Sequence, residues 1–363
     1  MLMALAGTSC ISRVRPAEEE TEELNVVFSL NLLDSEAEMT DKLGTAHDRP
    51  LRAALEDYLS TVLEDSVHDM DLLFYDQRHR RGETVRLTER ISGGRQTLYA
   101  DVPASDYRVA GAANLSAVSS LSLQDEDSEY TLKLVQNASG SVASHRAAVY
   151  TARKRVLVRE SEEVQTFELP FSMINAVAVL ALNRDSCDVR SIRADYIGLA
   201  DGYKIVDSAF LFDRNAVVKA DIIDVSPFMG SDQDYSEEAE RFLYEVFWNR
   251  WTRTPLMACA VALPSPSVGS EIIGTYAKIW TINLYVDLEN GTTTRNQIFI
   301  GKPLNPGHLL VIKGWLTENG SFTSTPEHEP YVPGAIEPPS DSTVVGVSVV
   351  LNWNQGGSYE TVL

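Results

Sequence analysis

The sequence has little of what would mark several common classes of protein. Its 363 residues include only three cysteines, and 31 Lys and Arg stand against 52 Asp and Glu, so the formal net charge is −21. A surface this acidic repels phosphate backbones, which argues against nucleic acid as a partner. After the first ten residues there is no apolar run of about 18 residues, the length that a membrane-spanning helix needs, so none is expected.

Sequence motifs of catalysis are also missing. There is no glycine-rich phosphate loop and no G-x-S-x-G elbow, and none of the six histidines has another four residues away. The acidic stretches 125–127 and 232–234 lack the spacing and glycine of a calcium loop, and solvated loops explain them better. No cofactor, no metal and no enzymatic activity are therefore expected. A secreted hydrolase remains an alternative, because glycosidase carboxylates meet only in the fold.

The N-terminus has the layout of a lipoprotein. Residues 1–10 form an apolar leader that ends in small residues and Cys10, and residues 11–23 form a polar, acid-rich stretch. A leader that is cleaved before a cysteine leaves that cysteine to carry acyl chains, several of which make a stable membrane anchor. The charged stretch is typical of a tether that does not fold. The sequence therefore predicts a signal peptide at 1–10, lipidation of Cys10 and a tether at 11–23.

The leader is shorter than usual. Secretory leaders run to about 15–30 residues with a basic start, whereas nine residues precede Cys10 and none of them is basic. A translation start upstream of Met1 would explain this. The alternative is a cytosolic protein with a short N-terminal extension.

The other two cysteines, Cys187 and Cys259, lie beside apolar strand patterns in separate parts of the sequence. Nothing in their spacing indicates a metal site or brings them together. Free cysteine is often buried, so both are predicted to be unpaired thiols.

The folded body begins near residue 24. Residues 24–33 alternate between apolar and polar side chains, as in a strand with one buried face. Pro50 starts a predicted helix. Its apolar face comprises Leu51, Leu55, Tyr58, Leu59, Val62 and Leu63. Residues 173–183 are apolar on both faces, which predicts a strand in the middle of a sheet. Residues 113–145 are expected to be long loops with one short strand near 130–135.

Many short strands, frequent turns and two helical inserts indicate an all-β protein with minor helices, built as β-sandwich domains in tandem. The charged stretch 159–163 interrupts the strand pattern. We therefore expect one domain at 24–160 and a second at 161–363.

Two features could contact a ligand. Trp248 and Trp251 are three residues apart on the second predicted helix, so they share a face and could form a platform for sugar; core packing or helix capping explains such a pair more often. Basic stretches at 78–81 and 153–155 stand out on an acidic chain. They are solvated segments or, more specifically, a docking or protease-sensitive site.

Several segments together resemble one family. They are DLLFYD (71–76), LYADVP (98–103) leading to DYRVAG (106–111), FELPFS (167–172) and YIGLADG (196–202), downstream of Cys10 and its tether. Their order is similar to that of the fimbrillin superfamily, specifically the FimB-like or Mfa-type fimbrial anchor and accessory proteins of Gram-negative anaerobes. The resemblance spans most of the chain. The short leader and the two helices depart from it.

The resemblance implies two transthyretin-like β-sandwich domains, a lipid anchor in the outer membrane, exposure at the cell surface and no catalysis. It implies a role in fimbrium assembly or adhesion, with other fimbrial subunits as partners and room for a host or bacterial surface ligand. Subunits could join by strand addition at an open sheet edge. The C-terminal segment 344–363 is the candidate strand, unless it completes its own sheet. The competing hypothesis is a glycan-binding surface lipoprotein.

Overall fold

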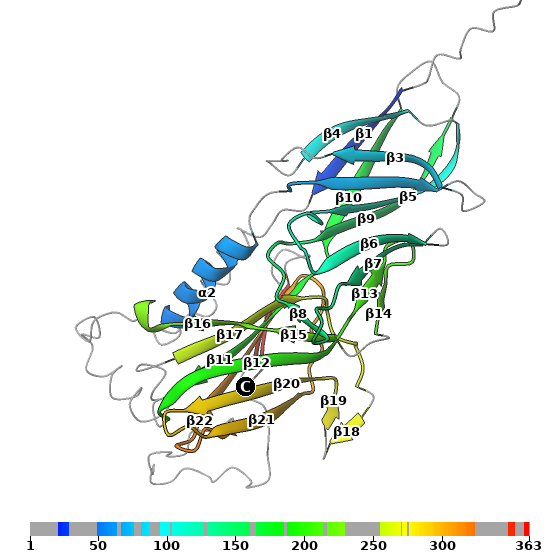
Figure 1. Ribbon diagram of the computed structural model, residues 1–363. Helices are drawn as coiled ribbons and strands as arrows, with labels where there is room; N and C mark the ends of the chain where they lie inside the picture. Colours follow the sequence, from blue (N-terminus) through cyan, green and yellow to red (C-terminus); the bar gives the residue numbers. More distant parts are fainter. Residues whose placement is uncertain are drawn as a thin grey trace, which may run out of the picture.

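The structure is a computed structural model of the whole chain (Figure 1). It describes residues 21–28, 49–63, 67–75, 81–87, 95–101, 104–126, 129–159, 165–184, 187–212, 216–228, 255–269, 271–273, 276–323, 348–352 and 359–362. These residues form an all-β protein with a single α-helix among them, which confirms the predicted fold class.

The first sheet has seven strands. In spatial order they are β3 (Arg81–Leu87), β2 (Met70–Tyr75), β5 (Ser105–Ala113), β9 (Tyr150–Val158), β10 (Thr166–Met173), β1 (Thr21–Phe28) and β4 (Arg95–Asp101). β1 runs parallel to β10 and antiparallel to β4. The remaining neighbours in the sheet are antiparallel.

The second sheet is built around β11 (Ala176–Asn183). It is flanked by β17 (Pro255–Ala262) and β22 (His308–Leu316), and completed by β16 (Asp221–Asp224), β23 (Phe322–Thr323), β24 (Ser348–Asn352) and β25 (Tyr359–Val362). Every residue of β11 is buried, because one face of this strand packs toward α2 and the other toward a further sheet. The prediction of a central strand here is confirmed.

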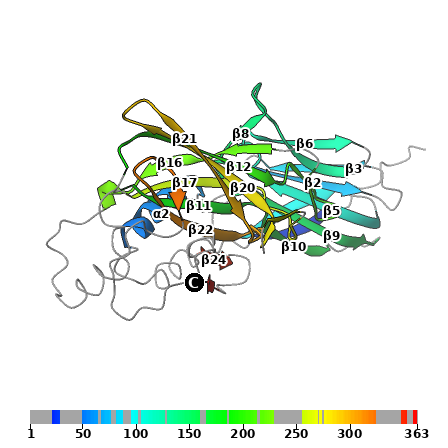
Figure 2. The same ribbon diagram turned by 90° about the horizontal axis from the view of Figure 1, so that it is seen from below.

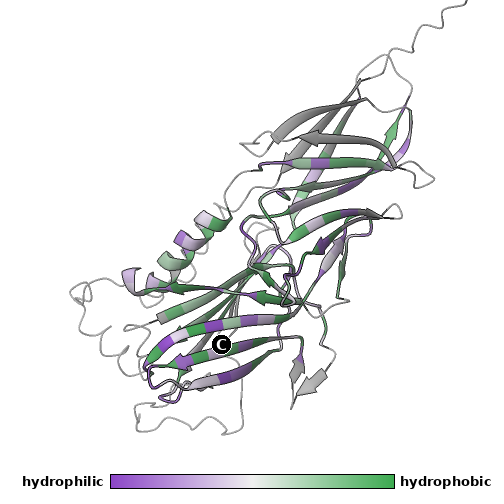
Figure 3. Cartoon of the chain, viewed as in Figure 1, coloured by the Kyte–Doolittle hydropathy of each residue, from purple (hydrophilic) through white to green (hydrophobic). Residues whose placement is uncertain are grey.

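Two smaller sheets cover the larger ones. The five-stranded sheet has the order β21 (Thr293–Ile300), β20 (Trp280–Leu288), β12 (Val189–Leu199), β15 (Ala216–Lys219) and β8 (Ser141–Ala143). The four-stranded sheet has the order β14 (Ala209–Leu211), β13 (Gly202–Lys204), β7 (Glu129–Leu134) and β6 (Leu121–Glu126). A separate hairpin joins β18 (Glu271–Ile273) to β19 (Tyr276–Lys278). Purple and green bands alternate along β12 in Figure 3, as expected of a strand with one face on a core.

The helix α2 (Arg49–Val62) lies along one side of the molecule (Figure 1). Its buried side chains Leu51, Leu55, Leu59 and Val62 fall on the predicted apolar face. They belong to a core that also contains residues of β2, β5, β9 and β10 from the first sheet and of β11, β17 and β22 from the second. The helix therefore joins the two large sheets by packing against both.

Two further cores lie on the outer faces of the large sheets. One fills the space between the second sheet and the five-stranded sheet, where Tyr196 and Trp280 stack with ring centroids 5.8 Å apart. The other lies between the first sheet and the four-stranded sheet, and includes Leu73, Tyr75 and Leu132. Each large sheet thus packs against a smaller one, and the two large sheets meet at α2.

The expected boundary at 159–163 does not separate two sheets. β9 and β10, which flank it, are antiparallel neighbours in the first sheet. The side chain of Gln165 also accepts from the backbone N–H of Arg159 and donates to its carbonyl. The charged stretch therefore lies between two strands of one sheet, and the chain passes to the second sheet only after Met173, through Ile174 and Asn175.

Strands from the two sequence halves are also mixed in the smaller sheets. β13 pairs with β7, and β15 pairs with β8, so strands beyond residue 200 complete sheets that begin before residue 145. The segment 113–145, expected to be mainly loops, holds three strands, β6, β7 and β8. Its Ser, Asp and Glu residues led to the expectation of loops, although Tyr130, Leu132 and Leu134 of β7 are buried.

The C-terminal strands complete the chain's own second sheet. β24 pairs with β22, and β25 pairs with β24. Figure 2 shows β24 beside β22. Of the two readings of the segment 344–363, the structure supports the one in which it adds to its own sheet.

Candidate functional site

The site residues predicted from the sequence are not part of the described structure. Cys10, Trp248 and Trp251 all lie outside the described residues. Lipidation of Cys10 and sugar contact by the tryptophan pair therefore stay predictions. The second predicted helix, which would carry Trp248 and Trp251, lies outside them as well.

Cys187 and Cys259 are free and buried, as predicted. Cys259 lies on β17, and its burial raises the pKa of its thiol well above the usual value. Burial raises the pKa of Cys187 too. Both side chains belong to hydrophobic cores, and since the thiolate is the reactive form of cysteine, the raised pKa disfavours reaction at either thiol. Within the part of the chain that the structure describes, no cluster of His, Cys, Asp or Glu could hold a metal ion, and no helix there could span a membrane.

A basic pocket opens on the surface of the described residues. It is lined by Arg108, Val109, Arg153, Lys154, Arg155, Val206 and Asp207 and has a volume of about 400 Å³. We call these residues the basic pocket. The arginines come from β5 and β9, and the other wall is the turn that joins β13 to β14.

Strand register brings the arginines together. Arg108 of β5 is paired directly with Arg155 of β9, and Ala110 with Arg153. Alternation along each strand places Arg108, Arg153 and Arg155 on the face of the sheet that carries Ala110. Ala110 belongs to the core under the four-stranded sheet. The same face is therefore apolar beneath that sheet and basic beyond it.

Two of these arginines are held by hydrogen bonds within the protein. Arg155 donates from Nε to both carboxylate oxygens of Asp106, at 2.9 and 3.0 Å, and its Nη2 also contacts that carboxylate. The hydrogen bond to Asp106 raises the pKa of Arg155. Arg153 donates from Nη1 to the carbonyl of Val206 at 3.1 Å. The guanidinium groups are thus held in place while their side chains stay exposed.

A second polar cluster lies beneath α2, and we call it the α2 junction. Tyr58 of α2 donates to Oδ2 of Asp221 at 2.8 Å, and its hydroxyl lies 3.3 Å from Ser144 Oγ. Arg146 donates to Oδ1 of the same Asp221 at 2.7 Å. Ser144 Oγ accepts from the backbone N–H of Val261 at 2.9 Å. Burial raises the pKa of Tyr58, so its hydroxyl remains a hydrogen-bond donor.

His145 lies fully buried next to this junction. Its Nδ1 accepts from the side-chain amide of Asn175 at 2.7 Å, and Asn175 Oδ1 accepts from the N–H of Val149. Since that amide can only donate toward His145, a proton on Nδ1 would break the bond. Burial lowers the pKa of His145 to about 4, so the ring is neutral at pH 7.

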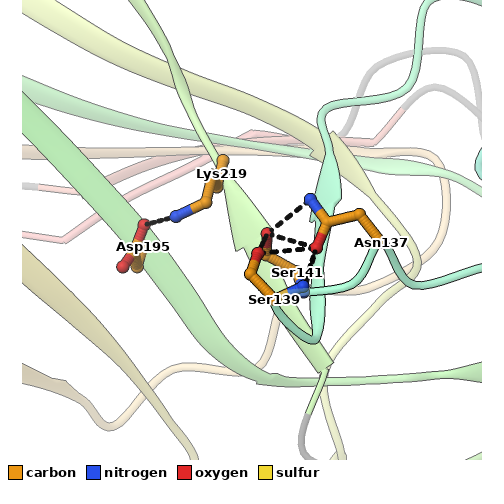
Figure 4. A network of polar contacts seen from close by, with 5 residues as sticks. All are labelled: Asn137, Ser139, Ser141, Asp195 and Lys219. Carbon is orange, nitrogen blue, oxygen red and sulfur yellow. Dashed lines mark hydrogen bonds and ion pairs between the residues drawn. The ribbon is translucent and has the colours of Figure 1, made fainter.

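A third polar group fixes the short strand β8 (Figure 4). Asn137 Oδ1 accepts from the N–H groups of Ser139 and Ser141 at 2.9 and 3.1 Å, which closes the turn before β8. Close by, Lys219 of β15 forms an ion pair with Asp195 of β12 at 3.2 Å. These contacts hold β8 at the edge of the five-stranded sheet, so we assign them a role in the fold and not in binding.

Of these clusters, only the basic pocket joins a recess to exposed charge. The sequence identified the stretch 153–155 as a basic spot, but it did not point to Arg108 or to the turn at Val206 and Asp207. The β5–β9 register and the β13–β14 turn bring these parts together. The sequence offered only basic residues in two separate extended segments, with nothing to show that these segments pair.

Comparison with known proteins gives a likeness of fold. No protein-family model and no curated protein matches this sequence. Among solved structures, a candidate polysaccharide-binding protein of Bacteroides thetaiotaomicron matches with a TM-score of 0.51 and 11% identity, over 95% of this chain and 99% of the other. A candidate adhesin of the same organism matches with a TM-score of 0.49 and 9% identity, over 86% and 96% of the two chains.

Fimbrial proteins are also among the matches. The fimbrial anchor protein Mfa2 from Porphyromonas gingivalis has a TM-score of 0.46 and 8% identity, over 91% of this chain and 97% of the other. At sequence identities this low, these matches describe a likeness of fold alone.

Proposed function

We propose that this protein is a non-enzymatic cell-surface lipoprotein that serves as a fimbrial anchor or accessory subunit, and that it works by binding other subunits. The sequence resemblance supports the class of protein. The sandwich fold, shared with the Bacteroides candidate polysaccharide-binding protein over nearly the whole chain, agrees with the architecture that the resemblance implies. The leader and the acidic tether before the body support attachment through Cys10.

The observation that carries subunit binding is the edge strand β21. Its eight residues pair with β20 on one side, and no other described strand pairs with it. An exposed edge of this length presents backbone donors and acceptors to which a partner strand can add. Three of its first five side chains are exposed and alternate with two half-buried ones, so this end of the strand lies at the surface.

The anchor is tested in the native host with a Cys10→Ala variant that keeps its natural leader. We expect the variant to lose its acyl chain and move from the membrane to the soluble fraction, and fimbriae to be shed or abnormal in length. Mass spectrometry of the N-terminal peptide and membrane fractionation measure the first effect, and electron microscopy the second. Unchanged membrane retention would reject the anchor.

Glycan binding is the second candidate. The observation that favours it is the fold shared with a protein described as a candidate polysaccharide-binding protein. An oligosaccharide array probed with the purified body distinguishes glycan binding from the fimbrial role. Clear oligosaccharide binding together with normal fimbriae in a deletion strain would favour the glycan-binding function.

A further inference from the structure

We infer that the basic pocket docks an acidic polypeptide segment of a partner subunit. This inference rests on the proposed function, because it names a contact through which the body would bind a subunit. The partner's chemistry follows from the charge, shape and lining of the pocket.

The charge of the pocket is opposite to that of the molecule. Its arginines are Arg108, Arg153 and Arg155, of which Arg155 is paired with Asp106, and its one acidic lining residue is Asp207. The chain as a whole has a net charge of −21. A basic recess on an acidic body attracts a carboxylate-bearing ligand, while the surrounding surface repels it elsewhere. The ligand is therefore directed to one place.

The arginines are arranged before the ligand arrives. Asp106 holds Arg155, and the Val206 carbonyl takes one N–H group of Arg153. A guanidinium has five N–H donors, so each keeps donors for a second acceptor. Holding the side chains in place lowers the entropy lost on binding, and planar guanidinium groups bind carboxylates through two parallel hydrogen bonds.

The lining favours a peptide over a sugar. The described residues around the pocket include arginine, lysine, valine and aspartate but no aromatic ring on which a pyranose could stack. Leu157 follows Arg155 on the same face of β9 and is 51% exposed. Arginine clusters with an adjacent apolar contact suit acidic peptide motifs.

The test uses a fluorescent peptide of six glutamates followed by two leucines, titrated with the purified full chain in low salt. Anisotropy should show saturable binding that weakens as salt rises. The double variant Arg108→Glu, Arg153→Glu should bind about tenfold more weakly or worse, because each loses a charge-assisted hydrogen bond and gains repulsion. Circular dichroism confirms that the variant is folded.

Arg190→Glu combined with Arg193→Glu is the matched control. Both arginines are exposed on β12 in the five-stranded sheet, away from the pocket, and the total change of charge equals that of the double variant. Binding should change less than twofold. Any of three results would overturn the inference. The control could weaken binding as much as the double variant, the peptide could show no saturable binding, or an oligogalacturonide trimer could bind more tightly than the peptide. Membrane release of the Cys10→Ala variant is measured separately, so the two proposals fail independently.

Discussion

The α2 junction and the basic pocket use the same kinds of side chain for different ends. At the junction, Tyr58, Arg146 and Asp221 bond to one another beneath a helix, and they tie α2 to β16 and to the segment before β9. In the pocket, Arg108, Arg153 and Arg155 are exposed on a sheet face, where solvent and ligands can reach them. Polar groups that satisfy each other hold the fold together, whereas polar groups left partly unsatisfied at the surface can bind. Four changes test this contrast.

The largest effect is expected where α2 packs on the two sheets. Leu59 is 1% exposed within the core that α2 shares with them, so Leu59→Ala should lower the free energy of unfolding by about 2–5 kcal/mol through lost burial and a cavity. Urea unfolding measures it. The neighbouring Ser60→Ala, on the exposed face, should change it by less than about 0.5 kcal/mol. Similar losses in both variants would mean that α2 is not held by its apolar face.

A pH effect is expected at His145. Its pKa of about 4 in the folded protein lies below the ordinary 6.5, so between these values the unfolded chain binds more protons than the folded one. Stability should therefore fall as the pH drops from 6.5 toward 4, by about 3 kcal/mol in total. His145→Gln should remove this part of the pH dependence. Identical slopes in urea unfolding across that range would contradict the assignment.

A smaller effect is expected at Asp221. Asp221→Asn keeps the shape of the side chain but removes the negative charge to which Tyr58 and Arg146 both donate hydrogen bonds. The Arg146 side chain is 58% exposed. We expect a loss of about 1 kcal/mol, since exposed ion pairs contribute little and the buried hydrogen bond is the larger part. Thermal unfolding at two salt concentrations would separate these parts. A loss that disappears at high salt would assign the effect to the ion pair alone.

The smallest effect on stability is expected in the basic pocket. Arg108→Gln should change the free energy of unfolding by less than about 0.5 kcal/mol, because the side chain is exposed. A loss as large as that of Asp221→Asn would show that the pocket serves the fold, and the contrast between the two clusters would fail.

The local features of the fold could be read from the sequence. One is the apolar face of the helix that starts near Pro50, and another is the burial of both faces of 176–183. Both follow from the spacing of apolar residues along the chain, which is visible in the sequence itself. The boundary at 159–163 could not be placed, because charges between two strands look the same whether the strands share a sheet or belong to separate domains. Only the pairing of β9 with β10 decides it.

The basic pocket could be predicted only in part, because some of its residues form a local stretch and others are brought to it by long-range strand pairing. Arg153 and Arg155 stand out as a basic stretch, but the position of Arg108 beside Arg155 depends on a strand register set over 47 residues of chain. The wall at Val206 and Asp207 depends on β13 crossing to pair with β7. Long-range pairing of this kind leaves no local trace in the sequence.

The position of β1 bears on how the chain can be made. β1 ends at Phe28, and its parallel neighbour β10 begins only at Thr166. At about 5–20 residues per second, ribosomes need roughly ten seconds or more to make the intervening chain, and during that time β1 lacks one of its two neighbours. Pairings so distant in sequence also form slowly. The pairs β1–β4, β2–β3 and β2–β5 are available earlier, but the first sheet cannot be completed until more than 160 residues have been made.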